Sequence, residues 1–557
     1  MRFSGAEIIV KLLERQGIET IAGIPGGANL PLYDALSTSS IRHVLTRHEQ
    51  GAGFIAQGMA RVTGQPAVFF ATSGPGATNT LTAIADAKLD SIPVICITGQ
   101  VPLAMIGSDA FQEVDTYGLS VPITKHNYLV RSVDELLRVI PEAFRIAVSG
   151  RPGPVVIDVP KDVQTAMLEF DVWPEPGGRG AGPELMAPEL AYAARMIDEA
   201  ERPMLYLGGG VVQSGSSALA RALAEKASIP AALTLMGLGV LPVEHPLCLG
   251  MLGMHGARYT NLAMERCDLL IAAGVRFDDR ATGKVAEFCP NARIIHLDID
   301  ASELDKIKSA HVPVAGDLAD SLAALLELVR PGERARWLGE VARFKREHPM
   351  IIPGADDPCS PYGVILKAAE LSGDEAIVCT DVGQHQMRTA QVYPFRRPRQ
   401  WLTSGGLGTM GFGMPAAIGA ALAAPDRTVL CFSGDGSIMM NIQDLATAAE
   451  HQVNIKIILT NNNALGLVRQ QQDLFYGKRY FASDYSRRVD FLKLAEGFGL
   501  PAIDLGSSDD PESDLAAALA KPGPCLIHVP VSPDAPVYPM VPPGAANSQM
   551  IGGETHV

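Results

Sequence analysis

Two short segments decide the fold class of this chain: TVLCFSGDGSIMMN at residues 428–441 and IKIILTNNN at residues 455–463. Each opens with an apolar run rich in Val, Ile or Leu and then stops at Gly, Asp or Asn. Short apolar runs bounded in this way are typical of buried parallel strands. We therefore predict two neighbouring parallel strands joined by one crossover helix.

Polar residues follow both of these predicted strands. Because the carboxyl ends of parallel strands lie on the same edge of a sheet, we expect Asp435 and Asn462 to converge. Carboxylate and amide oxygens suit Mg²⁺, which prefers to share its ligands with phosphates. Gly434 and Gly436 would let a diphosphate approach the backbone at the following helix N-terminus. If the GDG sequence is considered without the asparagines, the alternative to a metal site is an ordinary strand–turn–helix whose polar ends are solvated.

The alternation of strands and helices extends along the whole chain, as in PAVFFAT (66–72), PMLYLGGG (203–210) and RIIHLDID (293–300). This pattern predicts an α/β fold of three doubly wound domains with mostly parallel sheets. A Pro- and Gly-rich linker at 172–188 and a charged helix with a Pro-rich connector at 330–360 separate them. The predicted domains are residues 1–170, 188–330 and 360–545.

The composition is that of a globular protein and excludes several other classes. Of 557 residues, 47% are hydrophobic and 19% are charged, unlike disordered or fibrous chains. A net charge of −15 makes nucleic acid and membrane surfaces poor partners. We see no apolar run of the ~20 residues that a membrane span needs, and no signal or transit peptide. The eight cysteines form no CxxC pair, so we expect a reduced, cytoplasmic protein.

The GDG and NN pair at this spacing resembles the metal-binding motif of the thiamine diphosphate-dependent enzymes. The resemblance implies that Asp435 and Asn462 bind Mg²⁺ through their side chains and Ala464 through its backbone carbonyl. It also implies that Glu49, in RHEQGAGF (47–54), exchanges a proton with the aminopyrimidine ring of the cofactor. Without the resemblance, Glu49 would be an acidic residue favoured by the dipole at a helix N-terminus.

The loop GGLGTMGFG (405–413) contains a GxGxxG motif, but it lacks the context of a dinucleotide fingerprint. The strand before it is not a clean apolar run, and no suitable acidic residue follows about 20 positions later. By resemblance, this loop holds the two rings of thiamine diphosphate, with Met410 wedged between them; a core-filling Met410 is the alternative. The other contacts that the resemblance implies are Gln384, His385, Gly408, Gly436, Ser437, Leu465 and Gly466.

Over its whole length the chain resembles the catalytic subunits of acetohydroxyacid (acetolactate) synthases, of the isozyme I type. Matching segments include IPGGANLPLYDAL (24–36), SDAFQEVD (108–115) and GVRFDDR (274–280). The middle segment then resembles the family's FAD-binding domain, in which strand-end glycines admit a diphosphate and an arginine can bind it bidentately. The implied flavin contacts are Arg151, Gly208, Gly209, Gly210, Leu252, Gly253, Met254, His255, Gly274, Val275, Arg276, Asp298 and Asp317.

The reaction implied by the resemblance joins two 2-oxo acids, in the first common step of branched-chain amino-acid biosynthesis. Pyruvate loses CO₂, and the remaining two carbons join pyruvate or 2-oxobutanoate to give 2-acetolactate or 2-aceto-2-hydroxybutanoate. Arg280 would hold the carboxylate of the second substrate; an ordinary surface salt bridge is the alternative. The residues expected to line the channel near Glu49 are Gly26, Phe111, Gln112 and Lys161.

The resemblance also implies partners and a substrate preference. Because Glu49 and Asp435 lie in different segments, two subunits would build each site, in a homodimer or larger assembly with a small regulatory subunit. Many relatives have Trp where this chain has Gln471, and that indole is thought to favour 2-oxobutanoate. Gln471 therefore predicts pyruvate as the main acceptor, unless its side chain points elsewhere.

Two other functions stay open at this stage. A FAD-dependent pyruvate oxidase would share the three-domain plan, but the segments SDAFQE and GVRFDDR count against it. A non-catalytic homologue would have lost Glu49, Asp435 or Asn462, and all three are present. Glu49 also argues against glyoxylate carboligase, which lacks a Glu at this position.

Overall fold

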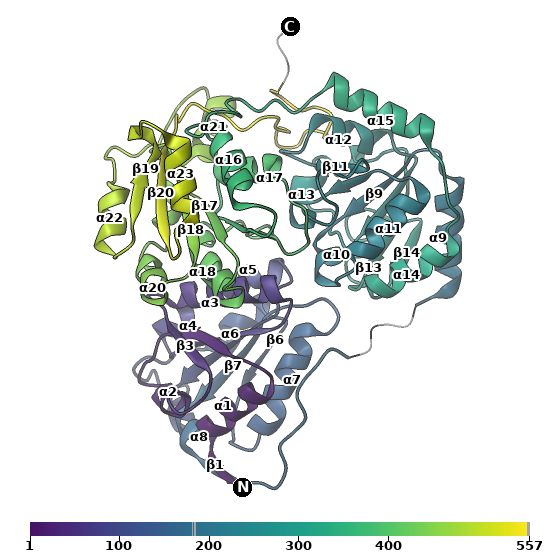
Figure 1. The fold of residues 1–557 in the computed structure, drawn as a ribbon. Helices are drawn as coiled ribbons and strands as arrows, with labels where there is room; N and C mark the ends of the chain where they lie inside the picture. The colour runs from purple at the N-terminus through teal and green to yellow at the C-terminus, as the bar shows by residue number, and fades with distance from the viewer. Residues whose placement is uncertain (181, 183–184, 554–557) are drawn as a thin grey trace.

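The chain folds into three α/β domains, each built around a six-stranded sheet with all pairings parallel (Figure 1). The computed structural model describes residues 1–180, 182 and 185–553. The predicted fold class is confirmed, and each sheet lies within one of the three predicted segments. The segment boundaries themselves stay a prediction. Of the predicted linker 172–188, residues 181, 183 and 184 lie outside the described residues.

The first domain contains a sheet in the order β3-β2-β4-β5-β7-β6. Its N-terminal helix begins as the local sequence dictates, because Ser4 and Glu7 form a capping box. The strands are β2 (Thr20–Gly23), β3 (Arg42–Leu45), β4 (Ala67–Ala71), β5 (Val94–Gln100), β6 (His126–Leu129) and β7 (Val155–Pro160), and β1 (Arg2–Ser4) pairs antiparallel with β8 (Met167–Glu169). The helices are α1 (Gly5–Arg15), α2 (Leu30–Leu36), α3 (Glu49–Thr63), α4 (Pro75–Asn79), α5 (Leu81–Leu89), α6 (Thr116–Ser120), α7 (Leu136–Val148) and α8 (Lys161–Thr165).

The central domain contains a sheet in the order β11-β10-β9-β12-β13-β14. Its strands are β9 (Pro203–Leu207), β10 (Ala231–Leu233), β11 (Cys248–Met251), β12 (Leu269–Ala273), β13 (Arg293–Asp298) and β14 (Val312–Ala315). Its helices are α9 (Ala187–Glu199), α10 (Gly209–Gln213), α11 (Ser217–Ala227), α12 (Arg258–Arg266), α13 (Asp279–Thr282), α14 (Leu318–Leu328) and α15 (Ala335–Glu347).

The third domain contains a sheet in the order β16-β15-β17-β18-β20-β19. Its strands are β15 (Ile377–Thr380), β16 (Trp401–Leu402), β17 (Val429–Gly434), β18 (Ile455–Asn461), β19 (Ala502–Asp504) and β20 (Cys525–Pro530). Its helices are α16 (Gly363–Ser372), α17 (Gln384–Val392), α18 (Gly413–Ala423), α19 (Asp435–Ile438), α20 (Asp444–His451), α21 (Gly466–Phe475), α22 (Phe491–Gly497) and α23 (Pro511–Ala520). The predicted strand pair is thus β17 and β18, as neighbours in one sheet.

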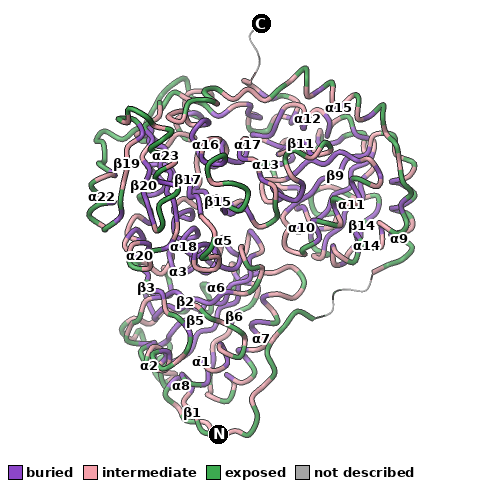
Figure 2. Tube along the Cα trace, in the orientation of Figure 1, coloured by how far each residue is buried: buried purple, intermediate pink, exposed green. Residues whose placement is uncertain are grey.

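The first and third domains are held together by α3 and α18, which lie side by side and are mostly buried (Figures 1 and 2). Small residues allow the two backbones to approach closely. A Cβ on Gly58 would lie 2.1 Å from the Ala416 carbonyl oxygen, and one on Gly419 would lie 2.0 Å from that of Ile55. Larger side chains at these positions would force the helices apart.

The interiors of the three domains are apolar, as the buried strands in Figure 2 show. The strands read as near-continuous Val, Ile, Leu and Ala runs because helices cover both faces of each sheet. Within the described residues, no helix combines the length and the apolar character needed to cross a bilayer.

Candidate active site

Asp435 and Asn462 converge at the carboxyl edge of the third sheet, as the sequence predicts. Gly434 of β17 pairs in register with Thr460 of β18, so the residues after each strand emerge beside one another. Asn462 Oδ1 accepts a hydrogen bond from the Ala464 N–H at 3.0 Å. Asn462 Nδ2 lies 3.5 Å from Gln384 Oε1, a long hydrogen bond that links the edge to the start of α17.

Asp435 is a buried carboxylate with one unused oxygen. Its residue is 4% exposed, and Oδ2 has no hydrogen-bond partner among the described residues. Burial raises the pKa of Asp435 to about 6, because the charged form loses its water. An unpaired buried acceptor is costly, and a bound cation would remove that cost. The donor set of Asp435, Asn462 and a backbone carbonyl therefore fits Mg²⁺.

Glycines let the side chains of Gln384 and His385 approach this edge closely. A Cβ on Gly466 would lie 2.5 Å from Gln384 Oε1, and one on Gly434 would lie 2.9 Å from His385 Nδ1. His385 is buried and its Nε2 has no hydrogen-bond partner in the described structure. Burial lowers the pKa of His385 to about 3, so the neutral ring can donate to an anion or accept from a donor.

Met410 reaches the same edge from the loop before α18. Its Cε lies 3.6 Å from the position of a Cβ on Gly436, next to Asp435. Met410 is half-buried, so its side chain is not packed entirely into the core. The predicted thiamine diphosphate contacts in the third domain, including Ser437 and Leu465, therefore gather around the ends of β17 and β18.

A second group of predicted residues lies at the carboxyl edge of the first sheet. Glu49 begins α3, and its Oε2 accepts a hydrogen bond from Asn79 Nδ2 at 2.9 Å. A Cβ on Gly76 would lie 3.4 Å from Glu49 Oε1 and 2.7 Å from Thr72 Cγ2. A Cβ on Gly26 would lie 2.6 Å from the Thr72 side chain. Gly26 and Glu49 are therefore brought together around Thr72.

Gln112, Phe111 and Lys161 are the other first-domain residues that the resemblance implies. Gln112 has a left-handed backbone (φ 60°), and its carbonyl oxygen would lie 2.8 Å from a Cβ on Gly74, which also has positive φ. Phe111 is 87% exposed, and Lys161, the first residue of α8, is exposed at the end of β7. Glu49 thus hydrogen-bonds within the first domain, while the neighbours of Asp435 belong to the third.

A cavity of ≈ 400 Å³ lies beside the central domain and is lined by residues of all three domains. Every predicted flavin contact except Gly253 lines it: Arg151, Gly208, Gly209, Gly210, Leu252, Met254, His255, Gly274, Val275, Arg276, Asp298 and Asp317. Gly253 has positive φ, and a Cβ there would lie 2.5 Å from the Arg280 carbonyl oxygen. This close packing against the Arg280 backbone explains why position 253 is a glycine.

In the wall of this cavity, two glycine turns pack backbone against backbone. A Cβ on Gly208 would lie 2.3 Å from the Gly274 carbonyl oxygen, and one on Gly210 would lie 2.6 Å from Gly274 Cα. Gly274 itself has φ +60°, which favours glycine. Arg151 lies at the cavity and pairs with Glu303 at 2.7 Å. Glycine turns with nearby arginines fit a nucleotide diphosphate.

The cavity also reaches residues that the sequence assigned to substrate and to thiamine diphosphate. Gly408, Arg280 and Gln471 line it. The Arg280 side chain is 68% exposed and lies 3.8 Å from the carboxylate of Asp279, so its guanidinium is accessible to an anion. Gln471 is exposed on α21.

Sequence reasoning missed several residues of the cavity wall. They include Arg61 and Asp90 from the first domain and Met236, Gln386 and Arg399 from the other two. They lie on or beside helices and strands without a local motif, and their positions depend on how the domains pack. We find no signal in the sequence that would have identified them.

The comparisons with known proteins agree with this architecture. Three family models match: "Thiamine pyrophosphate enzyme, N-terminal TPP binding domain" at residues 3–119, its central domain at 190–325 and its C-terminal TPP binding domain at 381–529. The central match spans the sheet whose glycine turns line the cavity. The C-terminal match contains Asp435 and Asn462.

Curated relatives cover almost the whole chain. The chain is 62% identical to the acetolactate synthase isozyme 1 large subunit of Escherichia coli (strain K12), over 99% of this chain and 98% of that protein. It is 47% identical to the acetolactate synthase large subunit of Parasynechococcus marenigrum (strain WH8102), over 99% and 91%, and 46% identical to the Escherichia coli isozyme 2 large subunit, over 98% and 99%. With its three matching domains, the chain belongs to the thiamine pyrophosphate enzymes and, within them, to the acetolactate synthase large subunits.

Proposed function

We propose that the protein is an acetolactate synthase that releases CO₂ from pyruvate and joins the remaining two carbons to a second 2-oxo acid. Pyruvate as acceptor gives 2-acetolactate, and 2-oxobutanoate gives 2-aceto-2-hydroxybutanoate. The observation that carries the proposal is one cavity wall shared by Gly408, Arg280 and Gln471. The loop that contains Gly408 also carries Met410, whose Cε lies 3.6 Å from the position of a Cβ on Gly436, next to Asp435.

The third domain would hold thiamine diphosphate and Mg²⁺. Asp435, Asn462 and the Ala464 carbonyl are the proposed metal ligands, supported by the unpartnered oxygen of Asp435. Bound thiamine diphosphate supplies the electron sink that lets CO₂ leave from pyruvate. The residues proposed to bind its diphosphate and rings are Gln384, His385, Gly408, Met410, Gly436, Ser437, Leu465 and Gly466.

The cavity would hold FAD. The glycine turns at Gly208–Gly210 and Gly274 line the cavity where its diphosphate would lie, and Arg151 and Arg276 supply positive charge at the wall. The reaction has no net redox step, so in this proposal FAD contributes to the shape of the site.

The remaining predicted residues have separate tasks. Glu49 holds a proton at Oε1 or Oε2 and exchanges it during the reaction, while Asn79 fixes the orientation of its carboxyl group. Arg280 binds the carboxylate of the acceptor, and Gln471 contacts its alkyl end. Gly26, Phe111, Gln112 and Lys161 form the channel near Glu49 and exclude water from the reacting atoms.

A second copy of the chain would complete each site. Glu49 and Asp435 belong to different domains, and large apolar side chains are exposed on both: Phe111 is 87% exposed and Phe481 is 84% exposed. A partner's third domain covering the first-domain edge would bury both surfaces.

We also propose a small regulatory subunit, because the relatives are named large subunits. The proposed location is a reducing cytoplasm, because all eight cysteines are free.

One assay tests the proposal directly. Purified protein with pyruvate, thiamine diphosphate, Mg²⁺ and FAD should form acetolactate and CO₂ in equal amounts, without reduction of the flavin. Flavin reduction by pyruvate would support the pyruvate oxidase alternative, which the acetolactate synthase relatives do not favour. Absence of both products with all cofactors bound would remove the proposed activity.

A further inference from the structure

A buried cluster of charged side chains lies where the first domain meets the loop before α18. Arg61 of α3 donates to Asp90 Oδ2 at 2.8 Å and lies 3.5 Å from Asp86 Oδ1. Asp86 belongs to α5, and Asp90 follows that helix directly. The three side chains are at most 5% exposed. Two carboxylates therefore share one guanidinium in the interior of the protein.

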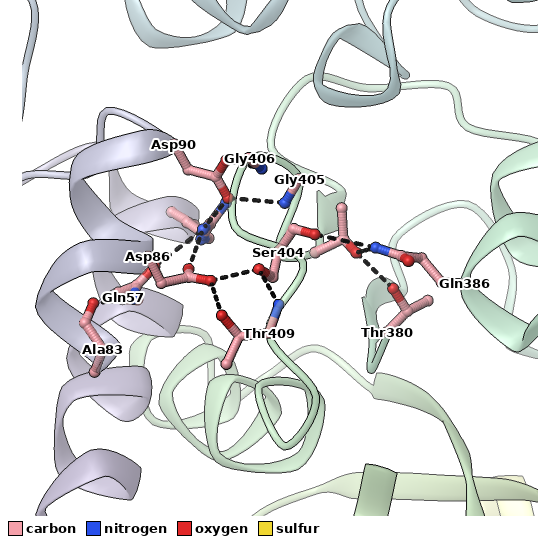
Figure 3. Close-up of polar contacts among 12 residues, drawn as sticks. Gln57, Ala83, Asp86, Asp90, Thr380, Gln386, Ser404, Gly405, Gly406 and Thr409 are labelled. Atoms are coloured by element: carbon pink, nitrogen blue, oxygen red, sulfur yellow. Dashed lines mark hydrogen bonds and ion pairs between the residues drawn. The ribbon is translucent and has the colours of Figure 1, made fainter. Parts of the chain in front are cut away.

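The loop at residues 404–409 supplies further donors to Asp86 (Figure 3). Ser404 Oγ donates to Asp86 Oδ2, and Thr409 Oγ1 donates to the same oxygen at 2.7 Å. The Thr409 N–H donates to Ser404 Oγ at 2.8 Å, which closes the loop on itself. Both hydroxyls thus point toward one first-domain carboxylate.

Asp90 binds the backbone of the same loop. Its Oδ2 accepts from the Gly405 N–H at 3.0 Å and its Oδ1 from the Gly406 N–H at 2.7 Å. A Cβ on Gly406 would lie 2.8 Å from Leu89 Cβ and 3.1 Å from Asp90 Oδ1. The absence of a side chain at Gly406 is what allows this close approach.

The energetics favour a single conformation of the loop. A buried carboxylate is costly unless it is paired and hydrogen-bonded. If the loop moved away, Asp86 and Asp90 would lose their hydroxyl and amide donors while remaining beside each other. Burial, with the neighbouring Asp90, raises the pKa of Asp86 to about 6, because the charged form loses its water.

This loop is also part of the cavity. Ser404, Gly405 and Gly408 line it together with Arg61 and Asp90, and Met410 follows directly. On the third-domain side, Gln386 Nε2 donates to the Ser404 carbonyl oxygen at 3.1 Å (Figure 3). The loop is therefore held from both domains at the point where it forms the wall.

We propose that Asp86 and Asp90, paired with Arg61, are positioning residues that fix the loop 404–409 as a wall of the cavity and so set the flavin affinity of the protein. The identity of the ligand, FAD, rests on the proposed function. The conformation of the loop is independent of that proposal and can be measured without any ligand.

Hydrogen–deuterium exchange of the full chain without cofactors tests the loop itself. Asp90→Asn should accelerate exchange of the Gly405 and Gly406 amides by about tenfold or more, since a hydrogen bond to a charged group is worth roughly 1.5–3 kcal/mol. Asp158→Asn is the control: Asp158 is also buried in the first domain and accepts from Thr98 Oγ1 at 2.7 Å and Gln100 Nε2 at 2.9 Å. Unchanged exchange in Asp90→Asn, or equal acceleration in the control, would overturn the proposal.

Flavin binding tests the consequence for the cavity. Thr409→Val keeps the shape of the side chain but cannot donate to Asp86, whereas Thr409→Ser keeps the hydroxyl. With FAD as the probe and quenching of its fluorescence as the readout, the valine variant should bind about tenfold or more weakly and the serine variant nearly as the wild type. Equal affinity of the two variants would overturn the link to flavin. If the wild type binds no FAD, that link and the FAD assignment both fail, and the exchange experiment still decides the role of the loop contacts.

Discussion

Gly434 and Thr460 are partners in the parallel ladder between β17 and β18. This register places the ends of the two strands at one edge, so that Asp435 and Asn462 emerge there within reach of the same ligand. The side chain of Asn462 is oriented by its bonds to the Ala464 N–H and to Gln384. The proposed metal site thus depends on the pairing of two strands and on a few short-range contacts.

Asp435→Ala should abolish detectable binding of thiamine diphosphate at ordinary Mg²⁺ levels. Asp435 is the only carboxylate among the proposed metal ligands, and its removal leaves neutral oxygens alone to attract the cation. Titration calorimetry at fixed Mg²⁺ measures this. Asp504→Ala is the control, because it removes a carboxylate of the same domain that pairs with His528 at 2.9 Å. Unchanged affinity in Asp435→Ala would refute the assignment.

Glu49→Gln should still bind thiamine diphosphate but lose activity by roughly 10²–10⁴-fold, as expected for the loss of a general acid–base group. The amide can accept the hydrogen bond from Asn79, so the local structure should persist, but it cannot exchange a proton. Steady-state acetolactate formation and cofactor titration separate the two effects. A variant that keeps more than half of the wild-type rate would exclude Glu49 from proton transfer.

Arg280→Ala should spare release of the first CO₂ and weaken the joining of the second substrate. The guanidinium is exposed at the cavity and makes only a long contact of 3.8 Å with Asp279 among the described residues, so its loss should affect an incoming anion more than the fold. Parallel measurement of CO₂ and acetolactate shows the split. Arg293→Ala, at a half-buried arginine of the same domain that lies 4.0 Å from Glu199, should change neither. Equal loss of both products would contradict this role.

Gln471→Trp should raise the share of 2-aceto-2-hydroxybutanoate when pyruvate and 2-oxobutanoate compete at equal concentration. An apolar contact with one additional methylene is worth roughly 1–3 kcal/mol, or about 10–200-fold, whereas a polar amide must be desolvated beside a methyl group. The wild-type ratio of 2-aceto-2-hydroxybutanoate to 2-acetolactate should not exceed about one, and Gln471→Asn should leave this ratio unchanged. A wild type that already prefers 2-oxobutanoate tenfold would show that another side chain fills this part of the cavity.

The free energy of unfolding should fall as the pH rises from about 4 to about 7, in part because of Asp158. Burial raises the pKa of Asp158 to about 7, against about 3.9 in an unfolded chain. Between these values the folded state binds more protons than the unfolded state. The contribution of Asp158 is therefore fully present below about pH 4 and is lost as the pH rises through about 7.

The measurement is the midpoint of urea unfolding at several pH values. Asp158→Asn cannot ionise, so its midpoint should vary less with pH than that of the wild type over this interval. Identical pH profiles for the two proteins would mean that Asp158 titrates alike in the folded and unfolded states.

The sequence by itself determined the strands, the fold class and the edge where Asp435 and Asn462 meet. These features are local or nearly so: apolar runs define the strands, and parallel pairing brings their carboxyl ends together. Family resemblance extended this to the predicted flavin contacts, and all of them except Gly253 line one cavity. Their binding roles stay predictions.

The contacts between domains were decided only by the tertiary structure. Asp86 and Thr409 are 323 residues apart, and Asp90 and Gly405 are 315 apart. No periodicity in the chain relates a carboxylate on α5 to a loop before α18. Their meeting depends on the packing of α3 against α18, where glycines let two backbones touch. Such packing depends on the shapes of complete helices and sheets. Short segments of sequence do not reveal those shapes.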